Sequence, residues 1–500
     1  MRSRHYALAG LVAGLAGIAV SHAVTMLLTL RATPLLAVAE AVIEHTPGEL
    51  AEALISVVGQ YDKPLLVTGV TIGLLVLSSI AGVVAQRSQV AAQLIFVAMG
   101  VVAFFAVQSR PGSSTYDVLP VIAGTITWLV VLSWLVDYLA KRRTADVDEG
   151  RRGFLIRAGV IAGAAVVVGL AGQFLGRSRR SVEAARALLR LPVGRGAVPR
   201  GANLEVAGIE PWRSGNEEFY RIDTALVIPT IDPNEWRLRI HGMVDQELEL
   251  RYRDLVSREL TERWITICCV SNEVGGDLIG NAWWSGVRIA DILRDLGVSP
   301  DADAVLQTSH DDWTCGTPLA ALTDDRNAML AIAMNGEPLP VEHGFPVRMI
   351  VPGLYGYVSA TKWLVDLEVT RFDQISAYWT ERGWGEMGPV RTQSRIDVPR
   401  GGADVKAGTR SIGGSAWAQH TGIEKVEYRL DGEQWRKARL GRVPGIDTWV
   451  QWTASLDVAP GSHTLAVRAT DRSGYTQTSV RRGVVPDGAT GWHTIDFSAE

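Results

Sequence analysis

Long apolar runs fill the first third of the chain, and short alternating runs fill much of the rest. A helix needs about 20 apolar residues to cross a bilayer, and four runs come close to that length or exceed it. These runs are residues 6–30, 64–85, 90–107 and 118–139. A fifth apolar run, residues 154–175, directly precedes the polar part of the chain. The pattern predicts an N-terminal membrane domain, residues 1–176, with about five transmembrane helices.

Between the first two runs, residues 37–59 mix carboxylates with apolar side chains, which favours an amphipathic helix at the membrane surface. If five spans are drawn, Arg2, Arg4, Arg87 and the cations of residues 141–152 all fall on one side. The positive-inside rule makes that side cytoplasmic. The sequence therefore predicts a multi-pass protein of the cytoplasmic membrane, with its C-terminal two thirds on the extracytoplasmic side.

An arginine pair stands immediately before the fifth run, in Gly150-Arg-Arg-Gly-Phe-Leu-Ile156. The pair and the following Phe-Leu resemble a twin-arginine export signal, here placed internally, and that route carries folded proteins. The alternative is a basic clamp beside the membrane. Because no Ala-x-Ala pattern is obvious after the run, we expect a retained anchor and no cleaved peptide.

The polar part divides by composition and periodicity. Residues 177–210 combine an Arg/Ala-rich stretch with Gly and Pro, which indicates a linker. Residues 236–242 and 264–267 alternate as strands within a domain expected to span residues 211–387. From residue 388 the chain shows short alternating runs separated by turn residues, which is typical of an all-β sandwich over residues 388–500.

Bulk properties restrict the function classes. A chain of 500 residues is too long for one core, so two or three domains are expected. The net charge of -4 gives no electrostatic case for a nucleic-acid partner. The three cysteines, two of them adjacent, cannot form a disulfide framework.

The adjacent cysteines end the expected strand, in Trp264-Ile-Thr-Ile-Cys-Cys-Val-Ser-Asn272. A thiolate at a strand end beside a flexible loop suits a soft metal that must keep open positions for a substrate. Buried core cysteines are the alternative. A zinc site of Cys268, Cys269, His310 and Cys315 is disfavoured, because neighbouring cysteines converge poorly on one ion.

Several motifs resemble the sulfite oxidase family of molybdopterin enzymes. Cys269-Val-Ser-Asn272 is similar to its Cys-x-x-Asn metal loop, and the run from Trp284 to Leu293 to its Trp-x-Gly-Val-x-Leu-x-Asp-x-Leu motif. Residues 334–353 are similar over nearly every position, and Lys362-Trp-Leu364 follows at close to the family spacing. The resemblance covers roughly residues 216–497. It implies an α+β molybdopterin-binding domain followed by an immunoglobulin-like dimerisation domain.

The resemblance also implies roles for individual residues. Cys269 would be the metal ligand and the catalytic thiolate. The cofactor, a pterin dithiolene that carries molybdenum and a phosphate, would be held by an entry segment (residues 216–224), by one of two aspartates and by a set of cations and donors. These candidates are Tyr220, Arg221, Asp223, Thr224, Asp311 or Asp312, His343, Arg348, Thr361 and Lys362. Arg provides a planar fork for phosphate, and His can donate a further hydrogen bond.

Departures from the family concern the substrate. Glu273 and Val274 stand where sulfite oxidases have an Arg pair, and sulfite, a small dianion, needs positive charge at the metal. The sequence therefore favours a neutral or larger substrate. The candidate pocket residues are Trp283, Trp284, Tyr355, Tyr357 and Trp384, with Arg482 of the C-terminal domain as a possible match to an Arg that reaches the site in relatives. The tryptophans can equally be core residues.

The predicted function is oxygen-atom transfer to or from a heteroatom of a small or peptidyl substrate, by a membrane-anchored molybdopterin oxidoreductase. The alternatives are a sulfite dehydrogenase and a non-catalytic, membrane-tethered binding protein. The expected partners are the lipid bilayer, a small-molecule substrate, an electron carrier (a quinone or a haem protein) and a second copy of the chain. Haem within the membrane domain is disfavoured, because only His22 lies in a span.

Overall fold

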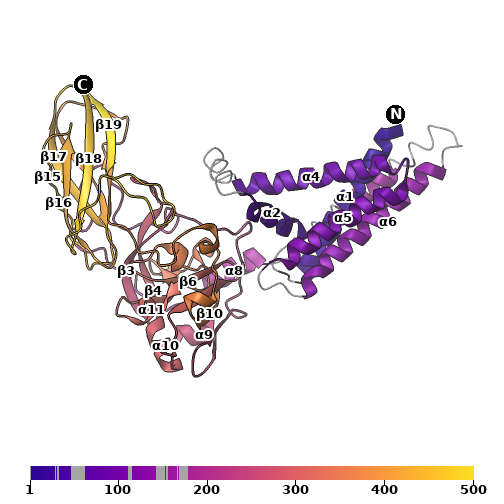
Figure 1. The fold of residues 1–500 in the computed structure, drawn as a ribbon, viewed down its shortest axis with the longest axis horizontal. Coiled ribbons are helices and arrows are strands. Elements are labelled where there is room, and N and C mark those ends of the chain that lie inside the picture. The colour runs from indigo at the N-terminus through magenta and orange to yellow at the C-terminus, as the bar shows by residue number, and fades with distance from the viewer. Residues whose placement is uncertain are drawn as a thin grey trace. The chain divides into compact units, whose positions relative to one another are not determined.

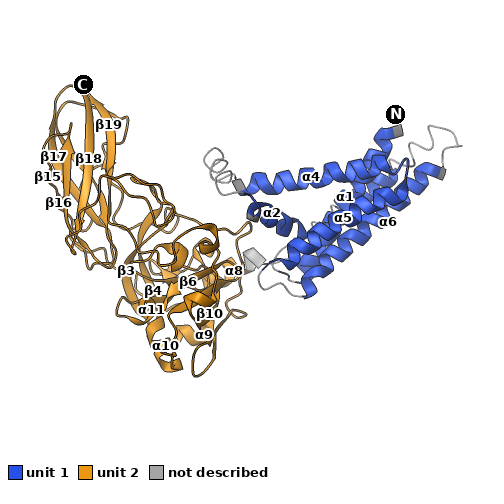
Figure 2. Ribbon diagram, in the orientation of Figure 1, with its two compact units in different colours: residues 1–178 blue, residues 179–500 orange. Residues whose placement is uncertain are grey.

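The computed structural model describes residues 2–28, 30, 33–46, 62–110, 115–141, 153, 156–165, 167 and 178–500. Two compact units divide the chain, residues 1–178 and residues 179–500 (Figure 2). The first is helical, and the second contains the sheets (Figure 1).

Apolar helices form the first unit. Its helices are α1 (Arg2–Leu27), α2 (Pro34–Glu44), α4 (Asp62–Val84), α5 (Gln89–Gln108) and α6 (Leu119–Lys141), with the 3-10 turn η2 (Thr115–Val118) before α6. Four helices, over residues 3–27, 63–84, 89–108 and 115–140, are long and apolar enough to cross a membrane. They coincide with the first four predicted runs.

Small residues allow α1 and α4 to pack closely. A Cβ atom on Gly10 would lie 2.0 Å from the carbonyl oxygen of Ser78, and one on Gly82 would lie 2.0 Å from that of Tyr6. Such close approach between apolar helices is a usual mode of packing in membranes. Most of the arginine-pair motif and parts of the fifth predicted run fall outside the described residues, as does the second half of the predicted surface helix; α2 covers its first half.

The first half of the second unit contains one mixed sheet, one antiparallel sheet and short helices. One sheet has the order β2-β1-β10-β5-β6, and the other has the order β3-β4-β7-β8, with β9 paired to β7. The strands are β1 (Arg237–Gly242), β2 (Leu248–Arg251), β3 (Thr261–Cys268), β4 (Ile279–Arg288), β5 (Ala304–Ser309), β6 (Thr314–Pro318), β7 (Met329–Met334), β8 (Glu337–Pro338), β9 (Arg348–Ile350) and β10 (Leu364–Thr370). The helices are α8 (Ser178–Leu188), α9 (Tyr252–Val256), α10 (Ile289–Leu296) and α11 (Leu319–Thr323), and the 3-10 turns are η4 (Val341–His343), η5 (Gly356–Val358), η6 (Phe372–Gln374) and η7 (Thr380–Arg382).

Two further sheets follow from residue 393, with the orders β11-β13-β17-β16 and β12-β19-β18-β14-β15. Alternating apolar residues of both sheets, among them Ile412, Trp452 and Val467, form one shared core. The strands are β11 (Gln393–Val398), β12 (Asp404–Val405), β13 (Gly408–Trp417), β14 (Ile423–Leu430), β15 (Arg436–Lys437), β16 (Arg439–Leu440), β17 (Val450–Val458), β18 (Gly461–Asp471) and β19 (His493–Ala499).

The segment expected to be a linker, residues 177–210, instead packs against the second unit. Arg186 on α8 donates to the carbonyl oxygens of Pro338 and Leu339, and the backbone N–H of Leu204 donates to Gln451. Its Gly and Pro residues fit a linker equally well, and only long-range contacts show that the segment is fixed. The second unit therefore begins close to Arg179.

A pair of reciprocal hydrogen bonds ties the C-terminal sheets to the rest of the second unit. The indole of Trp212 donates to the carbonyl oxygen of Trp449 at 3.1 Å, and the indole of Trp449 donates to that of Trp212 at 2.8 Å. Both rings are fully buried. Because buried indole N–H groups need a partner, each Trp fixes the backbone that satisfies the other.

Candidate active site

The loop after β3 carries the thiol pair. β3 and β4 form an antiparallel hairpin whose last pair is Cys268 with Ile279. The backbone N–H of Cys269 donates to Leu278 at 2.9 Å, and the side-chain oxygen of Asn272 accepts from the N–H of Leu278, also at 2.9 Å. Asn272 therefore closes the loop on itself. Gly275 has φ +85°, and a Cβ there would lie 2.3 Å from the ring of His493 on β19.

The two thiols point in different directions. Cys268 is 1% exposed and packs in the core beneath the sheet, with its thiol donating to the carbonyl oxygen of Cys269 at 3.3 Å. Cys269 lines a cavity. Burial raises the pKa of the Cys269 thiol, and hydrogen bonds from Ser271 and Val270 partly oppose that rise. The structure thus places one thiol, and not its neighbour, where a ligand could reach it.

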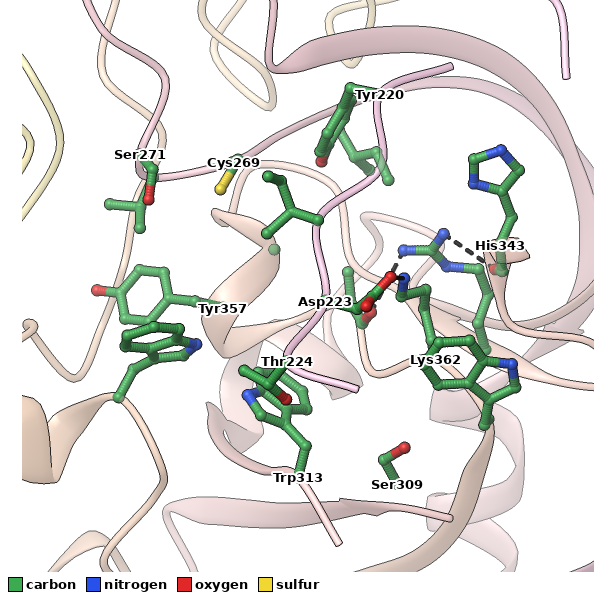
Figure 3. Close-up of a pocket in the computed structure, with 18 of the residues that line it drawn as sticks. Tyr220, Asp223, Thr224, Cys269, Ser271, Ser309, Trp313, His343, Tyr357 and Lys362 are labelled. Carbon is green, nitrogen blue, oxygen red and sulfur yellow. Dashed lines mark hydrogen bonds and ion pairs between the residues drawn. The ribbon is translucent and has the colours of Figure 1, made fainter. Parts of the chain in front are cut away.

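The cavity has a volume of about 130 Å³ and runs between the β3 loop, the entry segment and the start of β10 (Figure 3). In Figure 3, Cys269, Ser271 and Tyr357 lie on one side, and His343 and Lys362 lie on the other. The predicted site residues in its lining are Tyr220, Asp223, Thr224, Cys269, Asp311, His343, Arg348, Tyr357, Lys362 and Trp384. Segments far apart in sequence therefore meet here.

Arg348, on β9, is the central cation of the second side. It is 5% exposed, and its two terminal nitrogens donate to the carbonyl oxygens of His343 and Ala360 at 3.1 and 3.3 Å. Both acceptors are neutral, and within the described part of the chain its buried Nε has no hydrogen-bond partner. Burial lowers the pKa of Arg348 to about 10, so the group stays charged at neutral pH. A buried guanidinium with an unused N–H is suited to receive an anion.

His343 lies beside Arg348, at the end of η4. Its Nε2 donates to the carbonyl oxygen of Asn216 at 2.8 Å, which fixes the ring and leaves Nδ1 as the other nitrogen. Burial lowers the pKa of His343 to about 4, and the positive charge of Arg348 adds to the effect. The ring is therefore neutral at pH 7 in the cofactor-free protein. An arriving anion would favour its protonated form.

Lys362 is held by Asp223 of the entry segment. Its Nζ donates to the Asp223 carboxylate at 2.8 Å and to the carbonyl oxygen of Glu342 at 3.2 Å. Burial lowers the pKa of Lys362 to about 8, although Asp223 opposes the shift. Arg221 donates to the same carboxylate oxygen at 3.2 Å from an exposed position outside the lining. Its placement supports a role in holding Asp223 and not in touching a ligand.

Of the paired aspartates, Asp311 lines the cavity and Asp312 does not. Asp312 sits at the tip of the turn after β5 with φ +68°, which directs the two side chains apart. Asp311 accepts a hydrogen bond from the hydroxyl of Ser309, and burial raises its pKa. Of the two aspartates between which the sequence did not choose, Asp311 is the one that lines the cavity.

Other predicted residues lie outside the lining. Trp284 is fully buried, donates to the carbonyl oxygen of Ile265 at 3.1 Å and lies 5.3 Å from the guanidinium of Arg348, so it supports that cation from the core. Thr361 is fully buried against Cys315, with 3.2 Å between Oγ1 and Sγ. The lining also excludes Trp283, Tyr355 and Arg482.

Arg482 is exposed, and its backbone pairs with Thr490. Another arginine of the C-terminal sheets contacts the thiol loop instead: buried Arg395, on β11, donates to the carbonyl oxygen of Gly276 at 3.0 Å. Glu273 is also exposed, and its carboxylate is not part of the cavity lining.

Trp313 and Trp379 line the cavity although the sequence did not single them out. Trp313 follows the aspartate pair directly, and Trp379 begins the aromatic run that ends at Trp384. The rings of Trp379 and Trp384 lie 6.1 Å apart, and those of Tyr357 and Trp384 lie 5.8 Å apart. In the sequence, the position of Trp313 and Trp379 next to polar motif residues was the signal that could have identified them as lining residues.

Comparison with known proteins identifies the fold and its chemistry. A family model described as "Oxidoreductase molybdopterin binding domain" matches residues 225–379. An "Uncharacterized oxidoreductase YuiH" of Bacillus subtilis is 35% identical over 153 residues, which is 31% of this chain and 74% of that protein. Human mitochondrial sulfite oxidase is 29% identical over 289 residues, 48% of this chain and 53% of the relative.

The chain belongs to the sulfite oxidase family. It spans about half the length of the first curated relatives that it matches. The crystal structure of the sulfane dehydrogenase SoxCD from Paracoccus pantotrophus superposes with a TM-score of 0.51 at 22% identity, over 61% of this chain and 90% of that one. Membership makes the protein an enzyme, which excludes the binding-protein alternative, and makes molybdopterin its cofactor.

The residues present fit that cofactor. A sulfite oxidase family enzyme needs one thiolate for the metal and donors for a phosphate, and the cavity offers Cys269 on one side and Arg348, Lys362 and His343 on the other. The unused Nε of Arg348 marks the second side as a place for an anion. Among the described residues, no group of three or more His, Cys, Asp or Glu side chains could hold a metal ion. The thiol of Cys315, one member of the disfavoured zinc site, contacts the hydroxyl of Thr361.

Acid should destabilise the cofactor-free protein through His343. Its folded pKa, about 4, lies below the ordinary 6.5, so the unfolded chain takes up a proton between these values and the folded chain does not. Stability is therefore lost as pH falls from 6.5 towards 4, by about 2 kcal/mol between pH 7 and pH 5. Between pH 7 and pH 5, the thermal midpoint of His343→Gln should fall less than that of the wild-type protein.

His493 is a matched comparison, because burial also lowers its pKa to about 4 and it lies outside the cavity. His493→Gln should reduce the acid sensitivity similarly without lowering molybdenum content. If His343→Gln retained the full wild-type pH dependence, the conclusion that His343 is buried and neutral in the folded protein would be wrong.

Proposed function

We propose that this oxidoreductase is a multi-pass protein of the cytoplasmic membrane that acts on the extracytoplasmic side. There it would move an oxygen atom to or from a heteroatom of a small or peptidyl substrate. The four long apolar helices support the anchor, and the cations of residues 2–4, 87 and 141–152 support the orientation. The arginine pair at residues 151–152 supports export of a folded, cofactor-loaded domain.

The substrate class rests on one observation: the cationic lining residues lie apart from the thiol. His343 and Lys362 lie across the cavity from Cys269, and Arg348 bonds to the backbone of His343 (Figure 3). The thiol side has Ser271, Tyr357 and the Trp379–Trp384 pair nearby. A sulfite dianion would need positive charge at the metal, whereas a neutral sulfoxide or N-oxide fits an aromatic wall with a few donors.

Each residue then has a defined task. Cys269 would hold the metal; Arg348, Lys362 and His343 would hold the phosphate; and Asp223 would orient Lys362. When bound, the molybdenum cofactor supplies the two-electron redox change and carries the transferred oxygen. The aromatic residues beside the thiol would exclude water and orient the substrate.

The C-terminal sheets have a separate role in this proposal. Their two-layer arrangement around one core supports an immunoglobulin-like module, and the resemblance to the family supports its use in a homodimer. Arg395 of this module donates to the carbonyl oxygen of Gly276 in the thiol loop, so the module would also shape the active site within one chain.

A substrate screen on purified full-length protein tests the proposal. Metal analysis should give about one molybdenum per chain. With a reducing dye, methionine sulfoxide or an N-oxide should be reduced with a kcat/KM at least about tenfold above that for sulfite oxidation with an oxidising dye, a difference of about 1.4 kcal/mol in activation free energy.

Sulfite dehydrogenase is the alternative, and the likeness to sulfite oxidases favours it. Faster turnover of sulfite than of every sulfoxide and N-oxide tested would establish it. A folded protein without molybdenum or pterin would contradict both activities.

A further inference from the structure

The helical unit contains a second cavity, with a volume of about 570 Å³. Its walls come from α1, α2, α4, α5 and α6, and they are almost entirely aliphatic, with residues such as Leu74, Leu77 and Val102. A volume of this order suits a small organic ligand. The sulfite oxidase fold of the second unit does not require such a cavity.

Nε2 of His22 is the polar atom of interest in this wall. Thr125 donates to the carbonyl oxygen of Val121, and the indole of Trp128 donates to that of Gly14. Nε2 of His22 is buried and makes no hydrogen bond within the described part of the unit. A polar group left unpaired among apolar helices is costly, and ionisable residues at such positions usually serve a function.

We propose that this cavity binds the ring of an isoprenoid quinone, with Nε2–H of His22 donating to a ring carbonyl. The ring is flat and apolar apart from its two carbonyl acceptors, and its tail dissolves in the bilayer. Quinone and quinol differ by two electrons and two protons, and oxygen-atom transfer also exchanges two electrons. The inference rests on the proposed function, because only a membrane-bound oxidoreductase would need this carrier.

Other occupants fit less well. A lipid acyl chain would leave His22 without a hydrogen bond. A haem held by two histidines would need a second ligand, yet His22 is the only histidine among the described residues that line this cavity. His45, at the end of α2, is exposed and bonds through Nδ1 to the carbonyl oxygen of Ala41 at 2.8 Å.

Binding of decylubiquinone to the full-length protein in nanodiscs tests the site directly. Wild type should bind it saturably. His22→Leu should raise the Kd about fivefold, the effect of one neutral hydrogen bond. His45→Leu is the matched control and should leave the Kd unchanged, because His45 lies outside the cavity lining.

Two glycines of α4 allow a test by volume. A Cβ atom on Gly73 or Gly69 would meet nothing within 4 Å, so each can accept a side chain without a clash. Gly73 lines the cavity and Gly69, about one turn earlier, does not. Gly73→Leu should therefore weaken decylubiquinone binding at least about tenfold, whereas Gly69→Leu should bind like wild type.

Equal binding by the two glycine variants, or the absence of saturable binding in wild type, would overturn the inference. A co-purifying phospholipid that decylubiquinone cannot displace would also overturn it. Turnover with a soluble dye tests the proposed function by a separate measurement. This turnover does not need the cavity and should be unchanged in both His22→Leu and Gly73→Leu. If the wild-type protein showed no turnover with the dye, the proposed enzyme activity would be refuted. The measured Kd for decylubiquinone would still stand.

Discussion

Cys269→Ser should lower turnover at least about 100-fold, more than is usual when a residue that only orients a metal ligand is lost. The substitution replaces the only thiol that lines the cavity within the described residues with a hydroxyl, which is a poor ligand for a soft metal. Turnover with a soluble dye, normalised to the molybdenum content of each preparation, is the appropriate measurement. The loop itself should persist, because its closing hydrogen bonds come from the backbone and Asn272.

Cys268→Ser is the matched control. Cys268 is adjacent in sequence and also buried, but it faces the core, and a serine hydroxyl can still donate to the carbonyl oxygen of Cys269. It should cost about 1 kcal/mol of stability and keep most of the turnover. If Cys268→Ser were inactive and Cys269→Ser active, the assignment of the metal ligand would be reversed.

Arg348→Lys should reduce the molybdenum content of the purified protein about tenfold or more. Lysine keeps the charge but loses the planar fork and the Nε–H that has no partner among the described residues. Charge-assisted hydrogen bonds contribute about 1.5–3 kcal/mol each, so the loss of one or two lowers affinity by roughly one to two orders of magnitude. Metal analysis together with pterin fluorescence after denaturation measures the effect.

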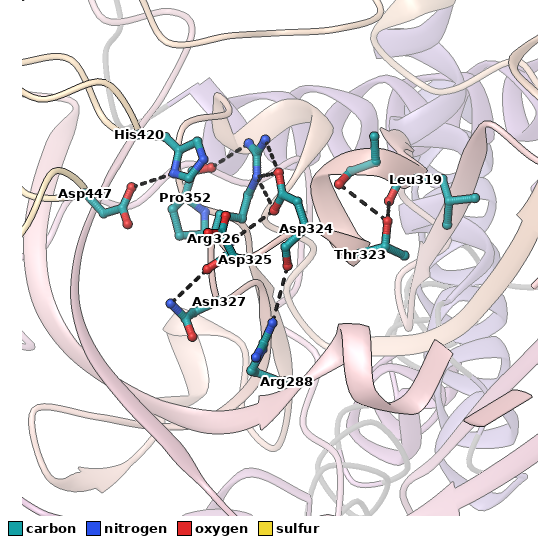
Figure 4. Close-up of polar contacts among 11 residues, drawn as sticks. Arg288, Leu319, Thr323, Asp324, Asp325, Arg326, Asn327, Pro352, His420 and Asp447 are labelled. Atoms are coloured by element: carbon teal, nitrogen blue, oxygen red, sulfur yellow. Dashed lines mark hydrogen bonds and ion pairs between the residues drawn. The ribbon is translucent and has the colours of Figure 1, made fainter. Parts of the chain in front are cut away.

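Arg326→Lys controls for the loss of a hydrogen-bonded arginine that is only partly exposed. Arg326 lies after α11, bonds to Asp324 through Nε and a terminal nitrogen, and donates to the carbonyl oxygen of Pro352 at 3.1 Å (Figure 4). It lies outside the cavity lining. It should lower the thermal midpoint about as much as Arg348→Lys while leaving molybdenum content unchanged. An equal loss of molybdenum in both variants would mean that Arg348 serves only the fold.

Cys269 and Arg348 line the same cavity. Because Cys269 is proposed to hold the metal and Arg348 the phosphate, either assignment can fail without the other. Of the two cations in the described part of this cavity, Lys362 is neutralised by Asp223, while Arg348 is hydrogen-bonded to neutral carbonyl oxygens. A cavity with surplus positive charge on one side, and no cation among the described lining residues on the thiol side, would hold an anionic cofactor and still accept a neutral substrate.

The sequence by itself determined the elements whose signal is local. Four apolar runs became long helices, because the length and low charge of a span do not depend on the rest of the fold. The alternating runs after residue 388 became the strands of two sheets for the same reason. The resemblance in residues 334–353 gave the family, which the comparisons then showed.

Only the tertiary structure decided which side chains face the cavity. The turn at Asp312 directs Asp311 inward, the packing of β4 places Trp284 in the core, and Arg395 reaches the thiol loop where Arg482 was expected to approach the site. Composition also misjudged residues 177–210, which pack instead of linking. The physical reason is common to all of these: the direction of a side chain is set by contacts with residues distant along the chain, and a local pattern contains no information about them.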